Sequence, residues 1–453
     1  MKYYLAIDLG ASSGRHIVGH LENGEIITDE VHRFKTGMDN SPHGLVWDIP
    51  RLYKEILEGI KIAFNKYKNI ESLSIDTWGV DYVLMNGDIE IPPFYAYRNR
   101  RCFKASEEVH KIVSFKKLYE NTGIQFASFN TIYQLYDDLK SGRLDEATDY
   151  LMLPSYFIYK LTSVKTHEYT NESTGALLNA LTKDYDYPTL DKLNFPRKLF
   201  GKINQPGDYV GELLPNIQKQ VGGNCKVYLC ASHDTGSAFE AVDIPDESII
   251  LSSGTWSLLG IKSKEAIITN ESLKANYTNE GGVGYIRFLK NIMGMYLANR
   301  VKEETGLNYK TVDSLISNST YHQTFDVNDS SLNAPINMKE AILNLLKDNP
   351  PSTDIDLFAS IYHSQALCYK KAIDELEEVT KKKYKSIYIV GGGARNIFLN
   401  KLVKEYTKLE VIALPIEATA LGNIKIQMKA SKGLWENKSK KFMHLMEWMY
   451  LKH

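Results

Sequence analysis

The sequence predicts an α/β protein with mixed sheets that uses one architectural unit twice. Strand patterns joined by tight turns open the chain, a helix and another strand follow them, and the second half begins in the same way. The composition fits this class, because 43% hydrophobic and 24% charged residues over 453 positions are typical of a globular protein and not of a disordered one.

Alternating apolar patterns predict the strands of the first half. We expect strands at residues 3–7, 15–21, 25–34, 72–76 and 80–85. Asn23 and Gly24 lie between the second and third strands, and this dipeptide suits the type I′ turn of a hairpin. Residues 49–67 are expected to form a helix, because their apolar side chains recur on one face.

The second half of the chain repeats this order. We expect strands at residues 226–230, 248–251, 256–261 and 386–390, and a long helix at residues 354–379. The hairpin around residues 252–255 resembles the first hairpin in hydrophobic pattern and turn chemistry. Residues 243–247 are short and contain a proline, which makes them the best candidate linker. We therefore predict an N-terminal domain of residues 1–242 and a C-terminal domain of residues 248–453.

Charge and targeting signals exclude several classes of protein. The chain has 54 Lys and Arg against 55 Asp and Glu, so its net charge of -1 provides no global basic field for nucleic acid or anionic lipid. We find no signal-peptide pattern, no run of about 18 apolar residues, and no metal or redox spacing among the four cysteines. We expect a soluble cytoplasmic protein with reduced thiols and without nucleic-acid or membrane partners.

The first hairpin turn is a candidate phosphate site. The common nucleotide-binding loops and the protein-kinase signature are missing from the sequence. Residues 10–15 (GASSGR) offer backbone N–H groups, two hydroxyls and an arginine to an anion instead. Asp8, at the end of the preceding strand, is placed to hold a hydrated Mg²⁺. An ordinary Ser/Gly turn is the alternative interpretation.

Two later turns extend this hypothesis. Residues 253–255 (SGT) could close on a phosphate chain from the opposite side, although a turn with one glycine is weak evidence by itself. The glycines at 391–393 follow a buried strand and leave a bare backbone on which a base or ribose could lie. A tight turn between a strand and a helix would explain the same glycines.

A polar segment, residues 231–236 (ASHDTG), follows the strand expected at 226–230. Consecutive Ser232, His233 and Asp234 cannot readily align as a nucleophile, base and orienting group, which argues against a serine hydrolase. A lone carboxylate such as Asp234 suits another task, the acceptance of a proton from a hydroxyl that attacks phosphorus. A helix N-cap would explain Asp234 equally well.

Residues 76–81 (DTWGVD) end another expected strand. The aromatic face of Trp78 could cover sugar C–H groups, and the carboxylates of Asp76 and Asp81 could accept hydrogen bonds from sugar hydroxyls. The alternative is that Trp78 fills the core while the two carboxylates stabilise turns or caps.

Eight short segments, in order, resemble the FGGY family of carbohydrate kinases within the actin/hexokinase superfamily. They are residues 8–15, 76–81, 123–126, 232–235, 252–257, 279–282, 290–294 and 390–393. The resemblance extends to about residue 427, nearly the whole chain. It implies two ribonuclease-H-like domains with the active-site cleft between them.

The resemblance also implies the residues of a site. Asp234 would be the general base, and Asp8 would hold Mg²⁺ through water. The implied sugar contacts are Gly79, His233, Asp234, Thr235 and Asn291. The implied ATP contacts are Ala11, Ser12, Ser13, Gly14, Arg15, Thr255, Asn299 and Gly391.

The implied activity is transfer of the γ-phosphoryl group of ATP to the 1-hydroxyl of L-rhamnulose, which gives L-rhamnulose 1-phosphate in L-rhamnose catabolism. Two alternatives stay open. The first is a kinase for another ketose, such as L-fuculose or xylulose, because one hydroxyl contact can invert selectivity. The second is a non-catalytic sugar or nucleotide sensor, against which the intact carboxylates of Asp8 and Asp234 argue.

Overall fold

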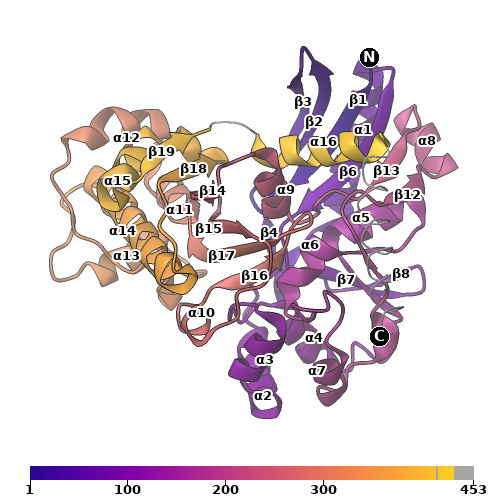
Figure 1. The fold of residues 1–453 in the computed structure, drawn as a ribbon, viewed down its shortest axis with the longest axis horizontal. Coiled ribbons are helices and arrows are strands. Elements are labelled where there is room, and N and C mark those ends of the chain that lie inside the picture. The colour runs from indigo at the N-terminus through magenta and orange to yellow at the C-terminus, as the bar shows by residue number, and fades with distance from the viewer. Residues whose placement is uncertain (415–416, 433–453) are drawn as a thin grey trace, which may run out of the picture.

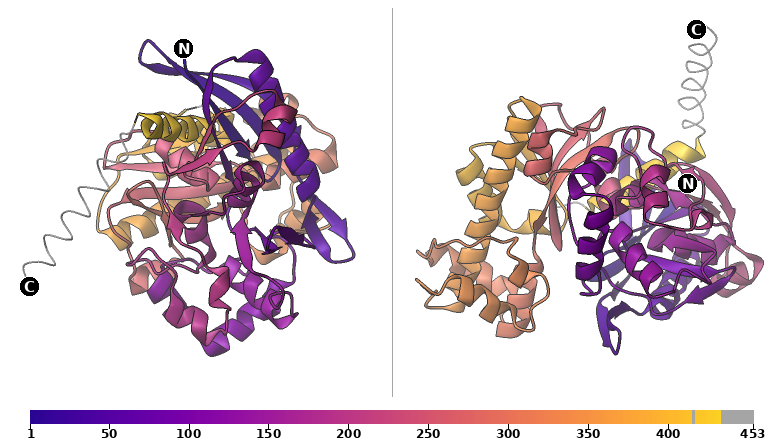
Figure 2. Two further views of the ribbon diagram at one scale, coloured as in Figure 1. Left: turned by 90° about the vertical axis from the view of Figure 1, so that its right-hand side faces the viewer. Right: turned by 90° about the horizontal axis from the view of Figure 1, so that it is seen from below.

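In the computed structural model the chain folds into two α/β lobes that lie side by side (Figure 1). Each lobe is built around a six-stranded mixed sheet. Figure 2 shows the N-terminal lobe in indigo to magenta and most of the C-terminal lobe in orange, again next to each other when seen from below. The structure describes residues 1–414 and 417–432, so the last part of the predicted C-terminal domain, residues 433–453, lies outside the described residues.

The sheet of the N-terminal lobe has the strand order β12-β13-β6-β1-β2-β3. Its strands are β1 (Tyr3–Leu9), β2 (Ser13–Glu22), β3 (Glu25–Lys35), β6 (Ile70–Thr77), β12 (Tyr209–Glu212) and β13 (Lys226–Tyr228). β1, β2 and β3 form an antiparallel meander, whereas β6 runs parallel to β1 and β13 parallel to β6. Asn23 and Gly24 both have positive φ between β2 and β3, as the predicted type I′ turn requires.

The sheet of the C-terminal lobe repeats this topology in the order β16-β17-β15-β14-β18-β19. Its strands are β14 (Ser248–Ser253), β15 (Trp256–Ser263), β16 (Thr278–Gly281), β17 (Ile286–Met293), β18 (Ser386–Val390) and β19 (Glu410–Ala413). β14, β15 and β17 form the meander, β18 runs parallel to β14, and β19 runs parallel to β18. The predicted duplication is confirmed, with β12 and β16 as added edge strands.

Helices and three small sheets surround the two large sheets. The helices of the first half are α1 (Ile49–Lys66), α2 (Cys102–Ile112), α3 (Phe115–Thr122), α4 (Thr131–Lys140), α5 (Leu153–Thr162), α6 (Tyr169–Glu172), α7 (Tyr187–Lys192), α8 (Pro215–Val221) and α9 (Asp234–Ala241). Those of the second half are α10 (Asn270–Lys274), α11 (Tyr296–Thr305), α12 (Tyr309–Leu315), α13 (Met338–Leu345), α14 (Asp354–Thr380), α15 (Ile397–Thr407) and α16 (Ala418–Ser431). The small sheets pair β4 (Met38–Ser41) with β5 (Gly44–Trp47), β7 (Tyr82–Asn86) with β8 (Ile89–Ile91) and β9 (Asp149–Met152), and β10 (His167–Glu168) with β11 (Ile203–Asn204).

Capping residues explain where the two longest helices begin. Asp48 is the N-cap of α1, and its side chain accepts a hydrogen bond from the Arg51 backbone N–H. Thr353 and Asp356 form a capping box at the start of α14. The predicted strands and helices of both halves are confirmed, with ends that shift only slightly. Over the described ranges, no helix is long and apolar enough to span a bilayer.

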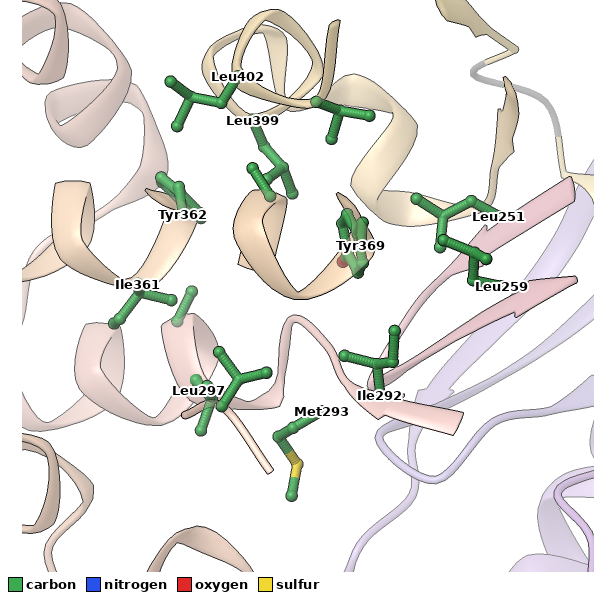
Figure 3. Close-up of a cluster of buried hydrophobic side chains, with 14 of the residues drawn as sticks. Leu251, Leu259, Ile292, Met293, Leu297, Ile361, Tyr362, Tyr369, Leu399 and Leu402 are labelled. Carbon is green, nitrogen blue, oxygen red and sulfur yellow. The ribbon is translucent and has the colours of Figure 1, made fainter. Parts of the chain in front are cut away.

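The core of the C-terminal lobe forms where α14 packs against the second sheet. Figure 3 shows Tyr369 of α14 directed toward Leu251, Leu259 and Ile292, which come from β14, β15 and β17. These side chains are almost completely removed from water, and such apolar burial is the main favourable term in folding. This core therefore fixes the positions of β14, β15 and β17, whose ends lie toward the other lobe.

The helix α16 belongs in sequence to the second half but packs against α9 and the first sheet, and Figure 1 shows it lying across the N-terminal lobe. The crossing is close at Gly422, where a Cβ atom would lie 1.8 Å from the Ser237 carbonyl oxygen. Asn423, one residue later, donates a hydrogen bond of 2.5 Å to the buried carboxylate of Asp76. The second half of the chain is thereby anchored on the first.

Candidate active site

A cleft of about 470 Å³ is lined by residues from both halves of the chain. Its volume is in the range of small-molecule sites. All residues predicted for the site line this cleft except Gly14. They are Asp8, Ala11, Ser12, Ser13, Arg15, Gly79, His233, Asp234, Thr235, Thr255, Asn291, Asn299 and Gly391.

The two candidate phosphate hairpins face each other across the cleft. The first joins β1 to β2 and the second joins β14 to β15, so the duplicated topology puts them at equivalent ends of the two sheets. The Oγ atom of Ser12 and the Oγ1 atom of Thr255 lie 3.3 Å apart, although 243 residues separate them in the sequence. An anion beside this contact would meet hydroxyl donors from both lobes.

The glycines of these turns have separate structural reasons. A Cβ atom at Gly14 would lie 2.2 Å from the Phe34 ring, so this glycine allows β2 to pack under an aromatic side chain of β3 and does not line the cleft. Gly391 has a φ of 84°, and a Cβ atom there would lie 2.8 Å from the Ser253 carbonyl oxygen. Gly391 and Gly393 thus permit close packing against Ser253, and all three glycines at 391–393 present bare backbone to the cleft.

Asp8 lies within a charged cluster on the first sheet. Strand pairing puts it between Arg15 on β2 and Asp76 on β6. The Arg15 guanidinium donates to the carboxylates of Asp8 and Glu417, and the Asp8 charge raises the pKa of Arg15. Burial, and then the neighbouring Asp8, raise the pKa of Asp76 well above its ordinary value. Asp8 and Arg15 reach the cleft, whereas Asp76 is fully buried.

The chemistry of this cluster fits a hydrated Mg²⁺. Among the described residues, no three His, Cys, Asp or Glu side chains come together as a metal cage. Mg²⁺ usually keeps several waters and binds through one or two carboxylates and the phosphates of its substrate. Asp8, at the cleft beside the first hairpin, is a carboxylate of that kind.

Asp234 begins α9 and lines the cleft. His233 occupies the N-cap position, so the interpretation of Asp234 as the N-cap is wrong. The Oδ1 atom of Asp234 accepts hydrogen bonds from the backbone and the hydroxyl of Thr235, at 2.6 and 3.1 Å. Burial raises the pKa of Asp234, and the negative charge of Asp8 acts in the same direction. A raised pKa brings a carboxylate closer to the range in which a general base works well.

A buried carboxylate holds the loop that precedes Asp234. Glu168 accepts hydrogen bonds from the backbone N–H and the hydroxyl of Ser232, and also from Thr170. The Thr77 backbone N–H donates to the Ser232 carbonyl at 2.9 Å, which ties the loop to the end of β6. Ser232 is 1% exposed and does not line the cleft, so it cannot act there as a nucleophile.

Sugar-binding candidates come to the cleft from both lobes. Asn291 on β17 donates from its backbone and side-chain nitrogens to Oε1 of Gln125, at 3.3 and 3.1 Å. Gly79 lies so close to Thr174 that a Cβ atom would be 2.8 Å from the threonine hydroxyl. Trp78 lies beside Gly79 on the cleft wall, although only 6% of its surface is exposed. Trp78 therefore serves the core and the cleft together.

The two carboxylates of segment 76–81 do not face the cleft. Asp81 is fully buried and accepts hydrogen bonds from the indole N–H groups of Trp47 and Trp78 and from the Tyr97 backbone. Burial raises the pKa of Asp81 to about 6. The hypothesis that Asp76 and Asp81 accept hydrogen bonds from sugar hydroxyls is therefore wrong. Both carboxylates bind partners inside the protein, but these partners are Asn423 and two indole groups rather than a turn or a helix cap.

Two family models match nearly the whole described chain. Residues 3–239 match the N-terminal domain, and residues 249–431 the C-terminal domain, of one family of carbohydrate kinases. The chain belongs to the FGGY family of carbohydrate kinases. The phosphoryl donor of the carbohydrate kinases in this family is ATP.

Individual proteins similar to this FGGY kinase cover most of its length. A rhamnulokinase of Oceanobacillus iheyensis is 41% identical over 94% of the chain and 93% of the relative. A rhamnulokinase of Halalkalibacterium halodurans is 39% identical over 95% of the chain and 94% of the relative. Among solved structures, a ligand-bound xylulose kinase of Lactobacillus acidophilus has a TM-score of 0.80 at 15% identity and covers 95% of this chain and 90% of its own. A Plasmodium falciparum glycerol kinase with ADP has a TM-score of 0.71 at 14% identity, with 95% and 90% covered.

The structure of this FGGY kinase adds cleft residues for which the sequence suggested no role. They include Gln125, Trp256, Glu280, Arg395 and Glu417. Gln125 and Glu280 lie within segments that carry the family resemblance, but the direction of their side chains depends on contacts between distant elements. Glu417 reaches Arg15 only because α16 crosses onto the first lobe.

Proposed function

We propose that this FGGY kinase transfers the γ-phosphoryl group of ATP to the 1-hydroxyl of L-rhamnulose and so forms L-rhamnulose 1-phosphate in L-rhamnose catabolism. The choice of sugar rests on relatives named rhamnulokinase that are 35% to 41% identical over nearly the whole chain. The observation that carries the proposed chemistry is that Asp234 shares one cleft with two facing hairpins.

On the sugar side, Asp234 is the proposed general base. Its carboxylate takes the proton of the 1-hydroxyl as that oxygen forms a bond to the γ-phosphorus of ATP and the bond to the ADP leaving group breaks. The proposed sugar contacts Gly79, His233, Thr235 and Asn291 hold the ketose in line for this attack. Such positioning is the larger part of phosphoryl-transfer catalysis, because little covalent chemistry falls to the protein.

On the nucleotide side, the two hairpins are the proposed phosphate clamp. The first hairpin, through Ala11, Ser12, Ser13 and Arg15, and Thr255 supply donors to the phosphate oxygens, and Gly391 and Asn299 flank the nucleoside. Gly14 was predicted for this clamp but does not line the cleft, so it has no part in it. Asp8 holds Mg²⁺ through its water shell, and the ion supplies positive charge to the phosphate oxygens when it is bound. Donors that are already in place stabilise the developing charge without reorganisation.

The domain assignment follows the same division. Residues 1–242 form the proposed domain for the sugar, the phosphates and the base, and residues 248–453 form the proposed nucleotide domain. The kinase is proposed to act in the cytoplasm on small molecules, without nucleic-acid or membrane partners.

ADP release with Mg²⁺-ATP across L-rhamnulose, L-fuculose, D-xylulose and L-ribulose tests the proposal. We expect the highest kcat/KM with L-rhamnulose, by about 10-fold or more, since one unpaired polar contact has at least that effect. Preference for another ketose would retain the kinase chemistry and overturn the substrate. Absence of turnover on every ketose, with ATP still bound, would favour a non-catalytic sensor.

A further inference from the structure

Behind His233, the wall of the cleft contains a fully buried arginine. Arg287 lies on β17 with an exposed fraction of 0%. Its Nε atom donates to the Gly281 carbonyl at 2.7 Å, its Nη2 atom donates to the Thr170 carbonyl at 3.2 Å, and its Nη1 atom lies 3.0 Å from Nδ1 of His233. Because β17 belongs to the C-terminal lobe and His233 to the N-terminal lobe, Arg287 joins the lobes beside the proposed base.

The contact with Arg287 determines which nitrogen of His233 carries the proton. A guanidinium group has donors only, so Nδ1 of His233 accepts this hydrogen bond and Nε2 carries the ring hydrogen. The Nε2 atom lies 3.4 Å from Oδ1 of Asp234. His233 therefore presents an N–H donor next to the carboxylate that is proposed to receive the sugar proton.

Glu280, on the neighbouring strand β16, faces the same two side chains and lines the cleft. Its Oε2 atom lies 3.2 Å from Nη1 of Arg287 and 3.3 Å from Nδ1 of His233, yet it makes no hydrogen bond of suitable geometry within the described part of the chain. The residue is 4% exposed. The charge of Arg287 offsets the cost of burying this oxygen, but its hydrogen-bonding capacity is left unfilled, and a hydroxyl of a bound ligand can fill it.

The charge of Glu280 decides what kind of ligand fits. Burial by itself would raise the pKa of this carboxyl, but the positive charge of Arg287, together with the neighbouring His233 and Asn291, lowers the pKa of Glu280 overall. The ionised group only accepts hydrogen bonds, and it repels a phosphate. Arg287 and Asn291 also point to the same face of β17, because they are four residues apart on one strand. This wall therefore suits a neutral, hydroxyl-rich molecule.

We propose that Glu280 is a sugar-binding residue whose carboxylate accepts a hydrogen bond from a ketose hydroxyl beside His233, and that Arg287 is the positioning residue for both side chains. This inference rests on the proposed sugar-kinase function and deepens it. It assigns the wall formed by His233, Glu280 and Asn291 to the sugar, and it leaves the hairpins around Ser12 and Thr255 to the phosphates.

Two substitutions of Glu280 test the proposal against a matched control. Glu280→Gln removes the charge, Glu280→Asp keeps the charge but shortens the side chain, and Glu58→Gln alters an exposed glutamate of α1 in the same way as the first change. The measurements are the dissociation constant of L-rhamnulose by calorimetry, the dissociation constant of a non-hydrolysable ATP analogue, and the melting temperature of each variant. If the wild-type enzyme prefers another ketose in the ADP-release assay, that ketose is used in place of L-rhamnulose in the binding measurements.

We expect Glu280→Gln to weaken ketose binding by about 10-fold, because the amide oxygen still accepts a hydrogen bond but lacks the negative charge that strengthens it. Glu280→Asp should also weaken it, because the shorter side chain withdraws the carboxylate from the hydroxyl. Binding of the ATP analogue should stay within about 2-fold of wild type, and Glu58→Gln should match wild type in every measurement. Unchanged ketose binding by folded Glu280→Gln would overturn the proposal. If Glu280→Gln does not fold, unchanged ketose binding by Glu280→Asp would overturn it. A wrong assignment of the substrate would be detected separately, as a preference of the wild-type enzyme for another ketose in the ADP-release assay.

Discussion

The hydroxyls of Ser12 and Thr255, one from each hairpin, lie 3.3 Å apart and are the proposed donors to one phosphate chain. Thr255→Val removes one of them, and we expect the KM for ATP to rise by about 10- to 100-fold while the KM for the ketose changes little, because hydrogen bonds to charged groups contribute about 1.5–3 kcal/mol. Steady-state kinetics with varied ATP and saturating ketose measure this. Thr182→Val changes an exposed threonine away from the cleft and should match wild type. An unaltered KM for ATP in Thr255→Val would remove this threonine from the clamp.

His16 makes the stability of the protein depend on pH independently of catalysis. The ring is fully buried, its Nε2 atom lies 3.1 Å from the Ile56 carbonyl oxygen, and burial lowers the pKa of His16 to about 3. In the unfolded chain the pKa of histidine is about 6.5. Between these values the unfolded state binds more protons than the folded state, so the free energy of unfolding falls as the pH falls.

The variant His16→Gln keeps a donor for Ile56 and removes this titration. From pH 7 to pH 5, wild type should lose about 2 kcal/mol more of its free energy of unfolding than the variant does, since each pH unit contributes up to about 1.4 kcal/mol per proton. Urea unfolding at the two pH values measures both losses. Equal losses in the two proteins would show that His16 is not the titrating group.

Residue types were easier to predict from the sequence than the direction in which each side chain points. The sequence placed Asp8 and Asp234 at strand ends, and both reach the cleft. It could not show that Asp81 turns inward, because the indole of Trp47 that binds it comes from another segment. Glu280 lies in a segment that carries the family resemblance, but no role was predicted for it, since its surroundings depend on Arg287 and His233, which the fold brings to it from two lobes.

At the scale of elements, the helix crossing between α9 and α16 depends on one glycine. Gly422→Ala places a methyl group against the Ser237 backbone, where a Cβ atom would lie 1.8 Å from the carbonyl oxygen. We expect the variant to lose about 1–3 kcal/mol of stability, the usual cost of overpacking, and a lower melting temperature by calorimetry should report it. At an open helix position, the same change would raise stability by up to about 1 kcal/mol. An increase in melting temperature would therefore contradict the close crossing.

The limits of most elements were predictable because local signals set them. Turn residues such as Asn23 and Gly24 separate strands, and the Thr353 capping box begins α14 whatever the rest of the chain does. The position of α16 was not predictable in this way. An apolar pattern shows that a helix is buried, but not which of two sheets covers it, and α16 packs on the sheet of the other half.

At the scale of the whole molecule, duplication creates the site. Two sheets of the same topology put two hairpins at equivalent positions, and Ser12 and Thr255 meet where the lobes face each other. The loop that precedes Asp234 lies near the end of the first half of the chain, at the start of α9. Asp234 therefore lines the same cleft as the two hairpins. The sequence predicted the two facing hairpins from the repeated pattern, whereas the grouping of His233, Glu280 and Asn291 on one wall of the cleft was visible only in the structure.

The most direct test of this account compares Asp234→Asn with wild type in ADP release from Mg²⁺-ATP on L-rhamnulose. Asparagine keeps the shape of the side chain but cannot take the proton, so kcat should fall by about 10²- to 10⁴-fold while the melting temperature and ATP affinity remain those of wild type. Asp246→Asn, at an exposed aspartate between the lobes, should leave kcat unchanged. Turnover by Asp234→Asn at the wild-type rate would contradict the assignment of Asp234 as the base on which this account rests.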